Sequence, residues 1–162
     1  MNTRPILYAE DEEADVFLLQ RAFKQAEISN PLRVVANGQE AIDYLAGTML
    51  AKGGEQFPTP HLLLLDVKMP LKSGLEVLQW MRSQMQLRML PTVVFTSSAQ
   101  ERDIRAAYEL GANAYLVKPS SVAEMVVMAK VIKEFWLIMN QPPPDWRASS
   151  LSDSVAPVVP NT

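Results

Sequence analysis

The chain has 162 residues, of which 48% are hydrophobic and 20% are charged, and its net charge at pH 7 is -3. This length and composition predict one soluble globular domain, while the acidic balance and the scattered Lys and Arg argue against a nucleic-acid partner. The absence of cysteine excludes disulfides and thiolate metal sites, and residues 1–5 lack the apolar region of a signal peptide. We therefore expect a cytoplasmic protein with no membrane segment.

Strand and helix patterns alternate along the first part of the chain. Residues 6–9 form a short apolar run typical of a strand, and residues 15–27 then repeat apolar side chains at helical spacing. A second strand is predicted over residues 32–36, followed by a helix over residues 39–50. Residues 52–60 contain two Gly and two Pro, which predicts a long irregular loop.

The third predicted strand is the leucine run 62–65, which ends at Asp66 and lies between Pro60 and Pro70. A strand that is apolar at every position is covered on both faces, because a half-exposed strand would alternate apolar and polar residues. The Asp at its end has two interpretations. It caps a turn or a helix, which is the commoner role of such an Asp, or it faces the crevice at the carboxyl ends of the strands, where open α/β sheets bind ligands.

The alternation continues to about residue 139. The predicted elements are a helix over residues 74–86, a strand over 92–96, a helix over 99–110, a strand over 114–117 and a helix from Ser120 or Ser121 to about Met139. Five strand–helix repeats predict an α/β three-layer sandwich, because parallel neighbours need a crossover connection. Residues 1–140 are thus predicted to form the domain. Pro and Ser dominate residues 141–162, which predicts a largely disordered tail in which Trp146 alone could be pinned to the domain.

Polar side chains stand at the ends of four of the five predicted strands. Glu10 and Asp11 follow the first, Asp66 follows the third, Thr96 ends the fourth and Lys118 follows the fifth. These ends share one edge of a parallel sheet, so the side chains are expected to converge. Carboxylates gathered in one crevice are costly unless a cation compensates their charge. Because Mg²⁺ binds through a few carboxylates together with phosphate oxygens, the cluster predicts a metal site that works with phosphate.

The same cluster indicates a reaction. With a cation bound, the carboxylate of Asp66 can act as the nucleophile towards a phosphoryl group. Phosphoryl transfer needs mainly positioning and neutralisation of charge on the equatorial oxygens. We expect Glu10 and Asp11 to hold the metal, and the ammonium of Lys118 and the hydroxyl of Thr96 to meet the phosphoryl oxygens.

The chain resembles the receiver domains of two-component response regulators. The resemblance covers nearly all of residues 5–139, and the residues that carry it are Glu10-Asp11, Asp66-x-x-Met69-Pro70-x-x-x-Gly74, Thr96 and Lys118-Pro119. It implies the flavodoxin-like (CheY-like) (βα)5 fold, with a five-stranded parallel sheet in the order 2-1-3-4-5. It also implies a signalling protein in a phosphorelay, rather than an enzyme.

The resemblance implies a role for each matching residue. Asp66 is implied to accept the phosphoryl group from a sensor histidine kinase in a reaction that needs Mg²⁺, or Mn²⁺ in its place, with the backbone carbonyl of Lys68 as a further metal ligand. Thr96 and Tyr115 are implied to form the conformational switch, although Tyr115 alone would be interpreted as a packed strand aromatic. The Lys118–Pro119 peptide bond is implied to be cis.

The last predicted helix is apolar on two faces. One stripe, which the sheet can bury, consists of Val122, Met125, Ala129, Ile132, Trp136 and Met139; the outer stripe consists of Val127, Val131, Phe135 and Ile138. Because this helix is peripheral in the fold, we expect its outer stripe to be covered by a second copy of the chain in a homodimer. The alternative is that the Pro-rich tail folds back over it. His61, the only histidine, lies at the opposite edge from the acids and is expected to be structural.

The long loop, the lack of an output domain in the sequence and the ending Glu134-Phe135-Trp136 resemble the small stand-alone receivers that partner phytochrome-type histidine kinases. Two other functions remain open. An aspartyl-phosphate phosphatase or phosphotransferase would usually place a second acid where Lys68 stands, and a receiver-like interaction module would not be phosphorylated at all. A Rossmann-type dinucleotide site is disfavoured, because no G-x-G-x-x-G follows the first strand.

Overall fold

The computed structural model describes residues 4–147 of the chain. Five strands form one parallel sheet in the order β2-β1-β3-β4-β5, and they are β1 (Ile6–Ala9), β2 (Leu32–Val35), β3 (Leu62–Leu65), β4 (Thr92–Thr96) and β5 (Ala114–Val117). The predicted strand positions agree with these bounds to within one residue. The predicted α/β fold and its strand order are confirmed.

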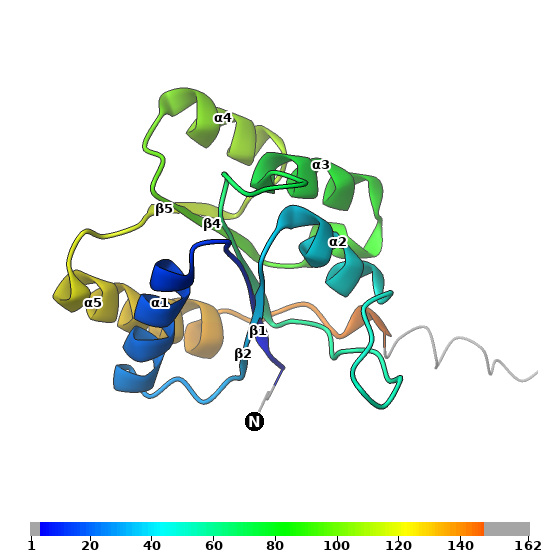
Figure 1. Cartoon of the computed structure of the whole chain (residues 1–162), viewed down its shortest axis with the longest axis horizontal. Helices are drawn as coiled ribbons and strands as arrows, with labels where there is room; N and C mark the ends of the chain where they lie inside the picture. Colours follow the sequence, from blue (N-terminus) through cyan, green and yellow to red (C-terminus); the bar gives the residue numbers. More distant parts are fainter. Residues whose placement is uncertain (1–3, 148–162) are drawn as a thin grey trace, which may run out of the picture.

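Five α-helices cover the two faces of the sheet (Figure 1). They are α1 (Glu13–Gln25), α2 (Gly38–Ala46), α3 (Gly74–Ser83), α4 (Glu101–Glu109) and α5 (Val122–Ile132), with a 3₁₀ turn η1 (Gln86–Met89) after α3 and a π-helix η2 (Lys133–Met139) after α5. Helices α1 and α5 lie on one face, and α2, α3 and α4 lie on the other. The chain therefore forms the three-layer sandwich that the sequence predicts. Within residues 4–147 no helix combines the length and apolarity needed to cross a bilayer.

The leucine strand β3 is buried on both faces, as its composition predicts. Leu63 and Leu65 point into the core under α2 and α3, whereas Leu62 and Leu64 point into the core under α1 and α5. All four are fully buried. This burial fixes β3 at the centre of the sheet and so fixes the position of the residue that follows it.

Three predicted helix boundaries are wrong at their C-terminal ends. Helix α2 ends at Ala46 and not at residue 50, because Gly47 takes a left-handed φ of 78° and closes the helix. Helix α3 ends at Ser83 and is followed by the separate turn η1. Helix α5 ends at Ile132 and the chain then continues as a π-helix, whose wider turn changes which side chains face the sheet.

The inner stripe predicted for the last helix is only partly buried. Met125, Ala129 and Ile132 are buried against the sheet as predicted, but Met139 in the π-helix is 71% exposed. Val122, at the first residue of α5, is also exposed. The predicted inner stripe is therefore correct only in its middle. His61 supports the π-helix, because its Nε2 lies 3.0 Å from the carbonyl oxygen of Trp136.

The described part of the predicted tail, residues 141–147, contacts the domain through its last two residues. Trp146 is 7% exposed and is part of the core under α2 and α3, which confirms that it is pinned. The guanidinium of Arg147 donates to the carbonyl oxygens of Tyr44 and Leu45, at 3.0 and 3.2 Å, and to that of Phe57. One buried indole and these hydrogen bonds are enough to hold a short Pro-rich segment. Residues 148–162 lie outside the described residues.

Candidate metal centre

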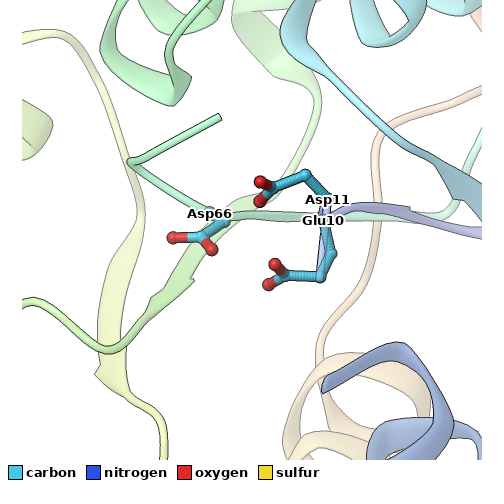
Figure 2. A group of neighbouring side chains, drawn as sticks. All are labelled: Glu10, Asp11 and Asp66. Carbon is cyan, nitrogen blue, oxygen red and sulfur yellow. The ribbon is translucent and has the colours of Figure 1, made fainter. Parts of the chain in front are cut away.

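The acidic residues predicted from the strand ends meet in space. One carboxylate oxygen from each of Glu10, Asp11 and Asp66 lies within 4.8 Å of the others, and Figure 2 shows the side chains of Glu10 and Asp11 pointing towards that of Asp66. Glu10 and Asp66 are buried, whereas Asp11 is exposed. An open cluster of three carboxylates could bind a hard divalent cation that keeps some of its waters.

The strand register explains why the acids converge. Strands β1 and β3 pair with Ala9 opposite Leu65, so the next residue of each strand, Glu10 and Asp66, leaves the sheet at the same level. The N–H of Asp66 donates to the carbonyl oxygen of Ala9 at 3.1 Å and extends this pairing by one residue. The parallel sheet therefore places the two acids side by side before any side chain is considered.

The turn after Asp66 is held by a glycine. The N–H of Gly74 donates to the carbonyl oxygen of Val67 at 2.8 Å, and a Cβ on Gly74 would lie 2.0 Å from the carbonyl oxygen of Asp66. No side chain fits at that distance. Helix α3 starts at this point with a capping box between Ser73 and Glu76, which fixes the direction of the turn. Gly74 thus allows α3 to pack directly against the backbone that presents Asp66.

Lys118 lies between the carboxylates. Its Nζ is 3.2 Å from Oδ2 of Asp66 and 2.9 Å from Oδ2 of Asp15, and it also forms an ion pair with Glu10. Burial acts to lower the pKa of Lys118, but the hydrogen bonds to Glu10 and Asp15 outweigh it and hold the pKa above its ordinary value. Lys118 is therefore a permanent cation next to Asp66.

The predicted cis peptide before Pro119 is wrong. No peptide bond among residues 4–147 is cis, so the Lys118–Pro119 bond is trans. The trans isomer of an X–Pro bond is the more stable one by about 0.5–1 kcal/mol, and the side chain of Lys118 reaches Asp66 with the bond in this form.

Glu10 is the most buried of the acids. Its carboxylate accepts hydrogen bonds from the hydroxyl of Tyr8 at 3.2 Å and from the N–H of Glu12 at 3.0 Å, in addition to its contact with Lys118. Burial raises the pKa of Glu10 to about 7, against the opposing effect of Lys118. The cost of keeping this carboxylate charged beside Asp66 means that a bound cation would stabilise the cluster.

The remaining predicted residues meet at the loop after β4. The hydroxyl of Thr96 is buried and accepts a long hydrogen bond of 3.4 Å from the N–H of Ser98. The hydroxyl of Tyr115 donates to the carbonyl oxygen of Ser98 at 2.9 Å, and the hydroxyl of Ser98 donates to Asp103 at 2.5 Å. Thr96 and Tyr115 thus contact the same loop residue from two sides.

A cavity of about 480 Å³ joins the acids to this loop. It is lined by Asp11, Glu12, Asp15, Asp66, Lys68, Thr96, Ser97, Ser98, Ala99, Gln100 and Lys118. Every predicted polar side chain except Glu10 and Tyr115 therefore lines one space, and Glu10 contacts it through Lys118. The N–H of Lys68 donates to Oδ1 of Asp66 at 3.4 Å, while a metal contact from the Lys68 carbonyl stays a prediction.

Two residues of this site were missed from the sequence. Asp15 resembles the ordinary acidic residue of a helix N-terminus, and its partner Lys118 is 103 positions away in the chain. Asp103 likewise lies in the first turn of α4 and contacts Ser98. No sequence signal singled out Asp15, because Asp11 precedes α1 and the pairing of Asp15 with Lys118 arises only from the tertiary structure.

The chain is similar to known proteins in sequence and in fold. The family model described as "Response regulator receiver domain" matches residues 6–130. The response regulator Rcp1 of Synechocystis sp. is 37% identical over 133 residues, which cover 82% of this chain and 88% of Rcp1. The probable methanogenesis regulatory protein FilR2 of Methanothrix harundinacea is 36% identical over 138 residues, which cover 85% of this chain and 86% of FilR2.

Solved structures agree with these relatives. The phosphorylated cyanobacterial phytochrome response regulator RcpA has a TM-score of 0.77 and 33% identity, over 86% of this chain and 98% of its own. The Mn²⁺-bound form of Rcp1 has a TM-score of 0.76 and 35% identity, over 86% of this chain and 99% of its own.

Proposed function

The chain belongs to the family of response regulator receiver domains, and from this premise we propose that it is a single-domain response regulator that accepts a phosphoryl group on Asp66 from a sensor histidine kinase. The main support is the position of Asp66. Its carboxylate belongs to a triad of acids, lies 3.2 Å from the Nζ of Lys118 and lines the same cavity as the hydroxyl of Thr96. The carboxylate nucleophile of Asp66, the ammonium of Lys118 and the hydroxyl of Thr96 are thus present together.

The donor set suits Mg²⁺, and Mn²⁺ could take its place. Glu10, Asp11 and Asp66 would hold the ion, with the Lys68 carbonyl as an expected further ligand. When bound, the ion supplies neutralisation of charge on the phosphoryl oxygens. An oxygen of Asp66 attacks phosphorus, and the bond from phosphorus to the histidine nitrogen of the donor breaks. The ammonium of Lys118 and the hydroxyl of Thr96 then donate hydrogen bonds to phosphoryl oxygens.

We infer a signalling role instead of an enzyme's role. The position two residues after Asp66 holds Lys68, where an aspartyl-phosphate phosphatase or phosphotransferase would be expected to carry an acid. The product of the reaction is then the modified protein itself. A cytoplasmic location belongs to the same proposal, and the absence of cysteine fits it.

The switch is proposed to run through Ser98. The hydroxyl of Thr96 now accepts a hydrogen bond of 3.4 Å from the N–H of Ser98. A phosphoryl group on Asp66 would draw this hydroxyl towards itself and away from Ser98. Because Tyr115 donates to the carbonyl oxygen of the same Ser98 at 2.9 Å, a shift of this loop would alter the position of the Tyr115 ring. Phosphorylation would thus change the surface near β5.

The test of the proposed function is metal-dependent phosphorylation of the purified protein. After incubation with a small-molecule phosphodonor, intact-mass measurement is expected to find one added phosphoryl group in the presence of Mg²⁺. Chelation of the metal is expected to prevent the addition, because the carboxylate triad alone would repel the donor. No adduct with Mg²⁺ would contradict the proposal, and so would an adduct formed equally well after chelation.

The upstream kinase is proposed to be of the phytochrome type. The support is the similarity to RcpA, whose structure is described as that of a cyanobacterial phytochrome response regulator. FilR2, which is described as a probable methanogenesis regulatory protein, is about as similar to this chain in sequence.

The protein is also proposed to form a homodimer through the outer stripe of α5 and η2. The stripe consists of Val127, Val131, Phe135 and Ile138, whose exposures are 61%, 59%, 49% and 54%. The described part of the C-terminal segment leads to α2 and does not cover this stripe. An apolar face of this kind in a soluble domain usually marks an interface.

Replacing Phe135 with Asp is expected to convert the dimer into a monomer, because a carboxylate would be buried without a partner in the interface. Sedimentation velocity over a concentration series measures this change. The matched control is Met85→Asp, which places the same charge on an apolar residue that is 83% exposed outside the stripe. A wild type that stays monomeric throughout, or a Phe135→Asp protein that still dimerises, would refute the interface.

A further inference from the structure

Lys118 has three carboxylate partners, and only one of them lies outside the metal triad. Glu10 and Asp66 belong to the triad, whereas Asp15 does not. Asp15 comes from the first turn of α1, and its side chain is 30% exposed at the wall of the cavity. Its Oδ2 is 2.9 Å from the Nζ of Lys118, closer than that of Asp66. The contact is therefore at hydrogen-bonding distance and directed into the site.

The three partners are not equivalent once a cation is bound. An ammonium has three N–H donors, and here each faces one acid. A divalent ion held by the triad would draw on electron pairs of Glu10 and Asp66 and would repel the ammonium, so both of those contacts would weaken. The contact with Asp15 would remain, because Asp15 is not part of the triad.

We propose, on the basis of the function proposed above, that Asp15 is a positioning residue for Lys118. It holds the ammonium at the wall of the cavity when the metal engages Glu10 and Asp66, so that an N–H of Lys118 is aimed at the incoming phosphoryl group. Asp15 itself contacts neither the metal nor the phosphoryl group. The backbone of Lys118 is fixed by its N–H bond to the carbonyl oxygen of Thr96 at 2.8 Å, so only the flexible stem of the lysine needs this support.

The test separates metal binding from the chemical step. Wild type, Asp15→Asn and Asp15→Glu are compared in Mg²⁺ affinity by calorimetry and in phosphorylation rate from a small phosphodonor at saturating Mg²⁺. Loss of the guiding carboxylate is expected to lower the Asp15→Asn rate about tenfold, as misplacement of a transition-state contact does. Its Mg²⁺ affinity is expected to change less than about threefold, because the residue is not a ligand. Asp15→Glu keeps the charge and is expected to recover most of the rate.

The matched control is Glu13→Gln, which is expected to leave the rate unchanged. It removes an exposed acid from the same turn of α1, and Glu13 is not one of the three carboxylates that contact Lys118. In a Lys118→Ala background, Asp15→Asn is expected to cause no further loss. A rate for Asp15→Asn equal to or above that of wild type would overturn the proposal, since Asp15 would then be idle or would compete with the phosphoryl group. A defect that vanishes at saturating Mg²⁺, or one that persists without Lys118, would overturn it as well.

Failure of the underlying function is recognised separately. If the wild type formed no Mg²⁺-dependent adduct, the proposed function would be wrong, and the positioning role of Asp15 would be wrong as well. Failure of the positioning role alone would appear only in the variants, beside a wild type that is phosphorylated normally.

Discussion

Replacing Asp66 with Asn is expected to abolish phosphorylation and to leave the fold intact. The amide has no anionic oxygen to attack phosphorus, yet it has the shape of the carboxylate, and its one oxygen can still accept either from the N–H of Lys68 or from the ammonium of Lys118. The measurement is the intact mass after incubation with Mg²⁺ and a small phosphodonor. The variant is expected to show no added phosphoryl group under conditions in which the wild type is modified.

A matched substitution tests the specificity of this loss. Asp43→Asn makes the same chemical change on α2, outside the cavity, and is expected to leave phosphorylation at the wild-type level. The melting temperature of Asp66→Asn is expected to stay within a few degrees of wild type, because one of several crowded carboxylates is neutralised. An adduct that persists in Asp66→Asn would place the modified residue elsewhere and contradict the assignment.

The second large effect is on stability. Trp146→Ala is expected to lower the free energy of unfolding by about 3–5 kcal/mol, because a buried aromatic side chain is removed and a cavity is left behind. Trp146 is only 7% exposed and packs in the core under α2 and α3. Urea denaturation followed by circular dichroism measures the loss, since the far-ultraviolet signal does not depend on the deleted indole.

The control is Tyr108→Ala on α4, which removes an aromatic ring that is 50% exposed. Its expected cost is about 1 kcal/mol or less, as for most surface substitutions. If Trp146→Ala cost no more than this control, the segment 141–147 would contribute nothing to the core, and the domain would end at residue 140 as the sequence suggests.

The fold was predictable because its strands are defined by local pattern. The leucine run 62–65 can be satisfied only by a strand covered on both faces, and the acids after β1 and β3 then meet by register. The C-terminal ends of the helices were less predictable. Apolar Met49 and Leu50 extended the helical pattern past Gly47, although the left-handed φ of that glycine ends α2.

Features that depend on distant partners were not predictable from the sequence. The π-helix after α5 is supported by the contact between His61 and Trp136, which are 75 positions apart. The pairing of Asp15 with Lys118 joins the first helix to the end of the last strand. The sequence allowed Trp146 to be pinned to the domain, but its site in the core under α2 and α3 depends on residues far away in the chain. The local sequence pattern therefore predicted the position of Asp66, but it did not predict that Asp15 would contact Lys118 or that His61 would contact the π-helix.

The reactive residues and the residues that hold the C-terminal segment lie at opposite ends of the strands. The acids and Lys118 lie where the strands end, whereas His61, which contacts the π-helix, lies just before β3 begins, near the segment that carries Trp146. Substitutions at well-separated sites usually have additive effects on the free energy of unfolding. Stability can consequently be adjusted at the second end while the reactive end keeps its geometry. Related chains could diverge in their C-terminal segments, and hence in their thermal tolerance, without losing the chemistry of the strand ends.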